Sequence, residues 1–489
     1  MNTSTILDLE PKALWVNFSA LNAIPRASKK EEKVREFVKE FADRLALPYK
    51  EDAIGNIVIY KPASPGMENC KTVAMQSHLD MVHQKNKGTD FNFDTDDIQM
   101  YVDSDWVKAK GTTLGADNGI GVATILALLA SDTIAHPAIE ALFTVDEEAG
   151  MGGAKFLGTD LLSADILLNL DTEEDDNLCI GCAGGVDLTA TATYTQELLP
   201  ASTNWVSYQI QLKGLEGGHS GVDIHKGLGN ANKLLNRLLY ELHQSVGFRL
   251  HSFSGGTLRN AIPRESEAIV VVAVDKSETF LEDYQQMTEI LKAEQRFTDS
   301  NLQFCIAEVA VPKSVLPVAN QQDFLQGIEA AINGVFKMSS SIEGLVETSN
   351  NIAKVVIKDG SVKISCLSRS SVRSNLWALA SSLKSAFELS GMQVTFKGEY
   401  PSWEPNTDSE ILKVCQATYQ ELFKEPAIVS AIHAGLECGI IGEKYPNLDM
   451  VSFGPTITGA HSPDEKVSIS STQKFWKYTL EVLKNIPHK

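Results

Sequence analysis

The segment Ser77-His78-Leu79-Asp80 places a histidine and an aspartate two positions apart. An imidazole is a good zinc ligand, and a carboxylate commonly fixes the orientation of such a ligand. His78 could therefore bind a metal ion while Asp80 supports it. The same spacing is also common in ordinary surface pairs, so this segment indicates a metal site only together with further ligands.

Two acidic segments offer such ligands. In Gly111–Gly119, GTTLGADNG, the glycines permit a tight turn and place Asp117 near the beginning of an expected helix, where it could bind a metal or act as the helix N-cap. Asp146, Glu147 and Glu148 follow directly on an apolar run. At a strand end that faces a cleft, three adjacent acids repel one another unless cations are present. One glutamate could then bind a metal while its neighbour transfers protons.

Two more residues complete a candidate set: Asp171 ends the run Leu-Asn-Leu-Asp, and His461 lies in Gly-Ala-His-Ser-Pro-Asp-Glu. Two histidines with several carboxylates suit zinc, with manganese or cobalt as alternatives, better than calcium or magnesium. Two ions about 3.5–4 Å apart need one bridging carboxylate and two terminal ligands each. That count is met, with Glu147 left over as a base, by His78, Asp117, Glu148, Asp171 and His461.

The elements that would position these residues alternate in type. Helical periodicity is found over residues 29–47 and 120–130, and apolar runs typical of strands over 56–60, 71–76, 139–145 and 166–170. This alternation predicts an α/β sheet, in which ligands bind at the carboxyl ends of the strands. His78, Glu147 and Asp171 each follow such an end.

The middle of the chain has another pattern. Strands are expected over 205–213, 267–274 and 301–311 and helices over 230–244 and 279–294, and a similar order recurs with helices at 324–336 and 376–390 and strands at 353–358, 361–367 and 393–397. This suggests two α+β halves in tandem. After residue 400 a helix over 409–424 and a strand over 448–453 resume the α/β pattern. We therefore expect a catalytic α/β domain at 1–186 and 399–489, interrupted by an α+β domain at 187–398.

Composition narrows the classes of protein. The 489 residues carry a formal charge of −20, which argues against nucleic acid or an anionic membrane surface as partner and fits a solvated acidic surface. No apolar run reaches the roughly 18–20 residues of a membrane helix, and the N-terminus does not resemble a secretory signal. Seven cysteines indicate reduced thiols in a cytoplasmic protein. The lone CxxC pair, Cys179 and Cys182, could serve redox chemistry or zinc, but nothing around it supports either role.

Eight motifs occur together in one order: HLDM, GTTLGADNGIG, DEEAGMGG, LNLDTE, GGHSG, RNAIPRE, HAGLECG and TGAHSPDE. In these the chain resembles the M20 metallopeptidases over nearly its whole length, and most closely their aminoacyl-histidine dipeptidase branch. The resemblance implies a phosphorylase/hydrolase-like dinuclear metallopeptidase domain interrupted by an α+β lid. It also implies that His78 and Asp171 hold one metal, that Glu148 and His461 hold the other, and that Asp117 bridges them.

The resemblance further implies roles in catalysis and substrate binding. Glu147 would be the general acid/base, Asp80 would orient His78, and His219 of GGHSG would stabilise the oxyanion. Substrate contacts would come from Asn260, Arg369, Gly435 and Glu437. His219 could instead be a surface-turn histidine and Arg369 a solvated loop arginine. Because His219 lies in the inserted domain, catalysis would need that domain to close.

The function implied is that of a cytoplasmic dipeptidase that hydrolyses aminoacyl-histidine and related dipeptides. A hydroxide bridging two divalent ions, zinc before cobalt or manganese, would attack the peptide carbonyl, with Glu147 as base. The family suggests a homodimer, although two α+β halves could instead let a monomer imitate a dimer's lid. A tripeptidase or an N-acyl amino acid amidohydrolase would use the same site. A non-catalytic peptide-binding protein is disfavoured, because every ligand position and the base are filled.

Overall fold

The computed structural model describes residues 5–489. Residues 1–4, the beginning of the segment that does not resemble a secretory signal, lie outside the described residues. The chain divides into two compact units. The first unit holds residues up to Gly181 together with Trp403–Ala431 and Leu436–Lys489, and the second holds Cys182–Ser402 and Ile432–Gly435. Among residues 5–489, no helix combines the length and the apolar character needed to cross a membrane.

The first unit is built on an eight-stranded sheet. In spatial order its strands are β1 (Tyr49–Glu51), β2 (Ile57–Lys61), β6 (Ile139–Thr144), β3 (Val73–His78), β7 (Ile166–Asn169), β23 (Asp449–Ser452), β8 (Asn177–Cys182) and β22 (Ile428–Ile432). The central strands β6, β3, β7 and β23 run parallel. Every residue of β3, β6 and β7 is buried, as is typical of parallel strands with both faces covered. The carboxyl ends of β6, β3 and β7 are therefore neighbours at one edge of the sheet.

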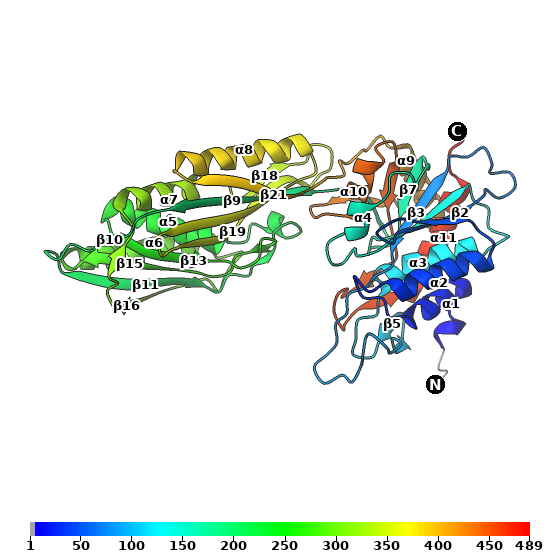
Figure 1. Ribbon diagram of the computed structural model, residues 1–489, viewed down its shortest axis with the longest axis horizontal. Helices are drawn as coiled ribbons and strands as arrows, with labels where there is room; N and C mark the ends of the chain where they lie inside the picture. The colour runs from blue at the N-terminus through cyan, green and yellow to red at the C-terminus, as the bar shows by residue number, and fades with distance from the viewer. Residues whose placement is uncertain (1–4) are drawn as a thin grey trace. The chain divides into compact units, whose positions relative to one another are not determined.

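Helices connect and cover this sheet (Figure 1). Helix α3 (Ala116–Leu129) links β3 to β6 and packs against both β3 and helix α1 (Lys12–Asn22). It is apolar and buried all round, whereas α2 (Glu32–Arg44) buries one stripe that includes Val34 and Val38. The remaining helices of the first unit are α4 (Gly152–Phe156), α9 (Glu410–Phe423), α10 (Glu437–Lys444) and α11 (Ile469–Lys484). A small sheet is formed by β24 (Ile457–Thr458), β25 (Lys466–Ser468), β5 (Trp106–Ala109) and β4 (Met100–Asp103).

The second unit contains one nine-stranded sheet. Its main path runs β16 (Gln303–Val309), β11 (Trp205–Lys213), β15 (Ser266–Ala273), β13 (Arg249–Gly255), β19 (Val346–Lys358), β20 (Ser361–Ser370), β9 (Gly184–Thr193) and β21 (Gln393–Tyr400), while β18 (Gly334–Met338) pairs with β19. Figure 1 shows helices along this sheet: α5 (Ala231–Ser245), α6 (Ser277–Gln295), α7 (Val318–Ala330) and α8 (Arg373–Leu389). Two short pairs complete the unit: β10 (Glu197–Leu198) with β17 (Ser314–Val315), and β12 (Gly218–His219) with β14 (Ala261–Ile262).

The sheet consists of two βαββαβ halves with the same strand order. The half formed by β11, β13, β15 and β16 and the half formed by β9, β19, β20 and β21 both place the fourth strand beside the first, followed by the third and second. This is the ferredoxin-like arrangement. The halves meet where β13 pairs with β19. The sequence suggested two halves in tandem, but the halves are nested. Strand β9 precedes the whole other half along the chain, and β19, β20 and β21 follow it.

One predicted helix ends earlier than expected. The apolar pattern predicted a helix over 324–336, but α7 ends at Ala330 and the segment from Gly334 pairs with β19 as strand β18. Gly334 has a φ of +87°, which a helix does not accommodate. The free edge beside β19 supplies hydrogen bonds that the periodicity of a single segment does not predict.

Candidate metal centre

His78, the last residue of β3, lies almost fully buried between two carboxylates. Its Nε2 is 3.0 Å from Oδ1 of Asp117 and 3.5 Å from Oδ1 of Asp171. Asp171 follows β7 by two residues, and Asp117 stands in the turn at the beginning of α3. Two strand ends and one helix start thus converge on a single imidazole nitrogen.

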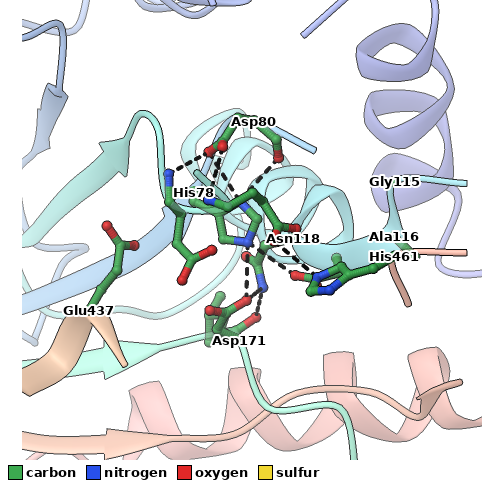
Figure 2. A network of polar contacts seen from close by, with 12 residues as sticks. His78, Asp80, Gly115, Ala116, Asn118, Asp171, Glu437 and His461 are labelled. Atoms are coloured by element: carbon green, nitrogen blue, oxygen red, sulfur yellow. Dashed lines mark hydrogen bonds and ion pairs between the residues drawn. The ribbon is translucent and has the colours of Figure 1, made fainter. Parts of the chain in front are cut away.

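His461 makes the equivalent approach from the far end of the sequence. Its Nε2 lies 3.1 Å from Oδ2 of Asp117 and 3.0 Å from Oε2 of Glu148. Glu148 follows strand β6, and its side chain is only 5% exposed. Figure 2 shows His78, His461 and Asp171 turned toward one another from separate segments of the chain.

Asp117 is shared by the two groups. Its Oδ1 faces His78 and its Oδ2 faces His461, so each carboxylate oxygen serves a different histidine. Ligand atoms of His78, Asp117 and Glu148 all lie within 4.8 Å of one another, close enough to hold a cation. A shared carboxylate with one histidine and one further acid on each side is a donor set suited to a pair of divalent metals.

The electrostatics of the centre also fit bound cations. Burial raises the pKa of Asp171 to about 6, and the negative charges of Asp117 and Glu148 add to that effect while His78 opposes it. Burial alone would lower the pKa of His78. The charge of Asp171 and the hydrogen bonds to Asp117, Asp171 and Asp80 instead raise this pKa well above its usual range. The buried Oε1 of Glu148 has no hydrogen-bond partner among the described residues. Mutually repelling buried acids with a free acceptor are stabilised by a metal ion.

Glu147 stands beside this group with its carboxyl in a poorly solvated position. Burial raises its pKa well above the usual range of a glutamate, and Asp171, Glu437 and Glu148 raise it further against the opposing effect of His78. A buried carboxyl with a raised pKa can both accept and return a proton. The structure therefore places a carboxyl with a raised pKa beside the candidate ligands.

Asp80 makes more contacts than support of a histidine requires. Its Oδ1 is 3.4 Å from Nδ1 of His78, and its two oxygens accept the backbone N–H groups of Glu147 and Glu148 at 3.0 and 3.1 Å. The hydroxyl of Ser28 donates to it as well, at 2.7 Å. Asp80 thus fixes one ligand and also the turn that carries the base and a second ligand.

Sequence reasoning missed three residues that hold the centre in place. Asn118 donates through Nδ2 to the carboxylate of Asp171 and to the carbonyl of Leu170. Arg26 and Glu465 are buried, and both hydrogen-bond to the backbone of Gly115, two residues before Asp117. Asn118 lies in GTTLGADNGIG and Glu465 in TGAHSPDE, so each is close in sequence to a predicted ligand, and this was the only signal that could have identified it. No feature of the sequence pointed to Arg26.

Glu437 and Gly435, both expected at the substrate pocket, belong to different units. Glu437 begins α10 and is only 2% exposed; its Oε2 accepts hydrogen bonds of 2.7 Å from both Gln76 and Thr144. Burial raises its pKa to about 7. Its Oε1 has no hydrogen-bond partner among the described residues, so this oxygen could receive a donor from a ligand.

In the second unit, the backbone fixes the tautomer of His219. Its Nδ1 accepts the N–H groups of Gly221 and Val222 at 3.2 and 3.1 Å. Burial lowers its pKa, and the positive charge of Arg369 lowers it further. Because Nδ1 accepts, the proton must reside on Nε2, which is then a donor for a ligand oxygen. Asn260 is an exposed loop residue whose carbonyl accepts the N–H of Ser220, next to His219.

Arg369 is a buried cation of the second unit, not a solvated loop residue. It lies on β20, is 5% exposed, and donates through Nη1 to the hydroxyl of Tyr400 at 2.6 Å. Its Nε has no hydrogen-bond partner among the described residues, and its charge lowers the pKa of both His219 and His433, although burial is the larger cause for each. A buried guanidinium beside neutral rings favours an anion. His433, 2.8 Å from the Ser349 hydroxyl, belongs to this cluster and not to the candidate metal ligands.

Comparisons with known proteins found similar sequences and structures over nearly the whole chain. A family model described as peptidase family M20/M25/M40 matches residues 74–485. The chain is 45% identical over 486 residues to the cytosol non-specific dipeptidase of Escherichia coli strain K12, which covers 99% of this chain and 100% of the relative.

Solved structures show the same likeness. The crystal structure of aminoacylhistidine dipeptidase from Vibrio alginolyticus matches with a TM-score of 0.95 and 45% identity, covering 99% of both chains. This match confirms the predicted fold class. Aminopeptidase PepT from Bacillus cereus matches with a TM-score of 0.57 and 15% identity over 98% of this chain and 99% of its own, a level that shows a shared fold alone.

Proposed function

The chain belongs to peptidase family M20/M25/M40 and is therefore a hydrolase of peptide bonds, and from this premise we propose that it is a cytosolic two-metal dipeptidase. Its substrates are dipeptides, aminoacyl-histidine dipeptides among them. Two relatives of 45% identity support this choice, since one is named a cytosol non-specific dipeptidase and the other an aminoacylhistidine dipeptidase. The observation that carries the two-metal proposal is the division of the Asp117 carboxylate between His78 and His461.

Five residues would hold the metals: His78 and Asp171 one ion, Glu148 and His461 the other, and Asp117 both. Zinc suits this mixture of imidazole and carboxylate ligands best, with cobalt or manganese as substitutes. When bound, the pair supplies Lewis-acid polarisation of the scissile carbonyl and lowers the pKa of water. Every other step falls to side chains of the chain itself.

Glu147 moves the proton. Because its pKa is raised, its carboxylate accepts a proton from the attacking water and returns it to the leaving amine. Asp80 accepts the backbone N–H groups of both Glu147 and Glu148 and so fixes the turn that carries these two side chains. A base held rigidly beside the reacting atoms needs no rearrangement during the reaction.

We assign to side chains of the second unit the binding of the oxyanion and of the substrate carboxylate. The Nε2–H of neutral His219 is a donor for the oxyanion of the tetrahedral intermediate. The buried guanidinium of Arg369 would bind the free carboxylate of a dipeptide, which limits substrates by length. Asn260 and Gly435 are proposed to contact the peptide, and Oε1 of Glu437 to receive its amino end. Of these residues, His219, Asn260 and Arg369 lie within the inserted domain proposed at 187–398, and Gly435 and Glu437 follow it in the chain.

The test is hydrolysis of β-alanyl-histidine and of several α-linked aminoacyl-histidine dipeptides by zinc-loaded protein. Tripeptides and N-acetyl amino acids are run beside them, because a tripeptidase or an amidohydrolase would use the same centre. Each assay is repeated after a chelator and again after zinc is restored. We expect cleavage of dipeptides that the chelator abolishes and zinc restores. Cleavage of tripeptides or N-acetyl amino acids alone would overturn the substrate assignment and leave the centre intact.

The resemblance also leads us to propose a homodimer. Sedimentation of the full chain at several concentrations tests this. A species of 53.3 kDa at every concentration would contradict it.

A further inference from the structure

A buried arginine and a buried glutamate lie beside the candidate metal centre without being ligands in it. Arg26 is 0% exposed and Glu465 is 3% exposed. Charges removed from water are costly unless they are paired and hydrogen-bonded. Most of the hydrogen bonds of these two side chains go to the backbone around the candidate ligands.

Glu465 accepts four consecutive backbone N–H groups. Its Oε2 is 2.7 Å from the nitrogen of Leu114 and 3.0 Å from that of Gly115, and its Oε1 is 2.7 and 3.3 Å from those of Ala116 and Asp117. These groups precede or begin α3, where a helix leaves its N–H groups unpaired and favours negative charge. One carboxylate thereby fixes the backbone of the proposed bridging residue.

The same glutamate also fixes His461. The two residues are four positions apart, and the turn between them is closed by a 3.1 Å hydrogen bond from the N–H of Glu465 to the carbonyl of Ser462. Since Glu465 is tied to the turn at Asp117, the distance from His461 to Asp117 depends on it.

Arg26 performs the corresponding task for His78. Its Nη1 donates to the carbonyls of Leu79 and Asp80 at 3.1 and 3.2 Å, directly after His78 in the chain. Its Nη2 donates to the carbonyl of Gly115 at 2.6 Å. Gly115 is therefore held from both sides, its N–H by Glu465 and its carbonyl by Arg26.

Two glycines leave space for the arginine. A Cβ atom at Gly115, where φ is +72°, would lie 2.4 Å from Nη2 of Arg26, and one at Gly119 would lie 2.8 Å from it. A side chain at either position would displace the guanidinium. Two glycines of GTTLGADNGIG, Gly115 and Gly119, thus have a physical reason beyond the tight turn itself.

We propose that Arg26 and Glu465 are positioning residues that hold His78, Asp117 and His461 at metal-binding distance before any metal binds. The inference rests on the proposed two-metal function. Neither side chain contacts the reacting atoms, so the effect expected from their loss is weaker metal binding. Groups behind the ligands of a metal site typically contribute about 10–100-fold to affinity.

The experiment is a competition titration of metal-stripped full-length protein with zinc against a chromophoric chelator. We compare wild type with Glu465→Gln, which keeps the shape but loses one acceptor oxygen, and with Arg26→Lys, which keeps the charge but loses the fork. Asp117→Asn reports the loss of a ligand. Both positioning variants should bind zinc about 10–100-fold more weakly than wild type.

Glu140→Gln is the matched control. Glu140 is another buried glutamate of the first unit, on β6, and it accepts the N–H groups of Ser163 and Ala164 at 2.9 and 3.1 Å, away from the candidate ligands. Thermal unfolding of the metal-stripped proteins reports the general cost of removing a buried carboxylate. Glu140→Gln should lower the unfolding temperature but leave zinc affinity unchanged.

The outcomes separate this inference from the proposed function. Wild-type zinc affinity in folded Glu465→Gln, together with weakened affinity in Asp117→Asn, would overturn the positioning role alone. Wild-type affinity in Asp117→Asn would overturn the metal centre itself. If Glu465→Gln does not fold, Arg26→Lys decides, since wild-type affinity in that variant contradicts the inference and weakened affinity supports it.

Discussion

Nε2 of His78 lies 3.0 Å from Oδ1 of Asp117, although the two residues are 39 positions apart in the chain. One ends a buried strand and the other stands at the beginning of a buried helix. Both elements are too well packed to move independently of the sheet, so their separation is a property of the fold. His461 makes the counterpart contact, with its Nε2 3.1 Å from Oδ2 of Asp117.

Removing one terminal ligand should remove one metal. Asp171→Ala eliminates a carboxylate that lies 3.5 Å from Nε2 of His78 and leaves the group at His461 and Glu148 unchanged. We expect elemental analysis to find about one metal per chain where wild type holds two, because each ion would share only Asp117 with the other. Full occupancy of both sites would show that Asp171 is not a ligand.

Glu147→Gln should separate catalysis from metal binding. The amide cannot accept the proton, so we expect kcat to fall by about 10²–10⁴-fold, while elemental analysis finds the same metal content as in wild type. The backbone N–H that binds Asp80 is retained in the variant, so the turn keeps its position. Substantial turnover by a metal-loaded variant would rule out Glu147 as the base.

His219→Ala should lower kcat without loss of metal. Removing one preorganised oxyanion donor costs about 10²–10³-fold in kcat. His225 offers a matched control, since it stands in the same turn, is exposed and, among residues 5–489, bonds only locally to the carbonyl of Val222. Equal effects of His219→Ala and His225→Ala would indicate that His219 is an ordinary turn histidine.

Arg369→Lys should weaken discrimination between dipeptides and their C-terminal amides. The guanidinium can bind a carboxylate through two parallel hydrogen bonds, which an ammonium cannot reproduce. We expect wild type to prefer the free dipeptide in kcat/KM and the variant to lose most of that preference through a higher KM. An unchanged preference would mean that another group binds the carboxylate.

His433 should make the protein less stable in acid. Burial lowers its pKa from 6.5 to about 3, and Arg369 and His219 add to the effect. Between those values the unfolded chain binds more protons than the folded chain, so stability falls as pH decreases, by at most about 1.4 kcal/mol per pH unit. His433→Gln, which has no titrating ring, should lose less stability between pH 7 and pH 5 in urea unfolding. The same loss in both proteins would contradict this.

Strands and helices of the first unit were predictable because burial there is complete. Apolar runs over 71–76, 139–145 and 166–170 predicted strands, and the structure has buried strands at Val73–His78, Ile139–Thr144 and Ile166–Asn169. The ends of these strands place His78, Glu147 and Asp171 at one edge of the sheet. The resemblance to the M20 metallopeptidases then implied which residues share a metal. The nested halves of the second unit were not predictable, because strand β9 finds its partners β20 and β21 more than 160 residues later in the chain.

By itself the sequence determined the family, the enzyme class and the candidate donor set, since these depend on residue types at fixed spacing. Only the tertiary structure decided which groups hold these side chains in place. Asp80 binds the backbone of Glu147, Arg26 binds the carbonyl of Gly115, and Glu465 binds the N–H groups at the start of α3. In the second unit, Arg369 donates to the hydroxyl of Tyr400. The physical reason is that such contacts use backbone groups or single hydroxyls brought together by folding. Backbone N–H and carbonyl groups are the same at every position, so a hydrogen bond to them across 89 or 350 residues leaves no pattern in the sequence.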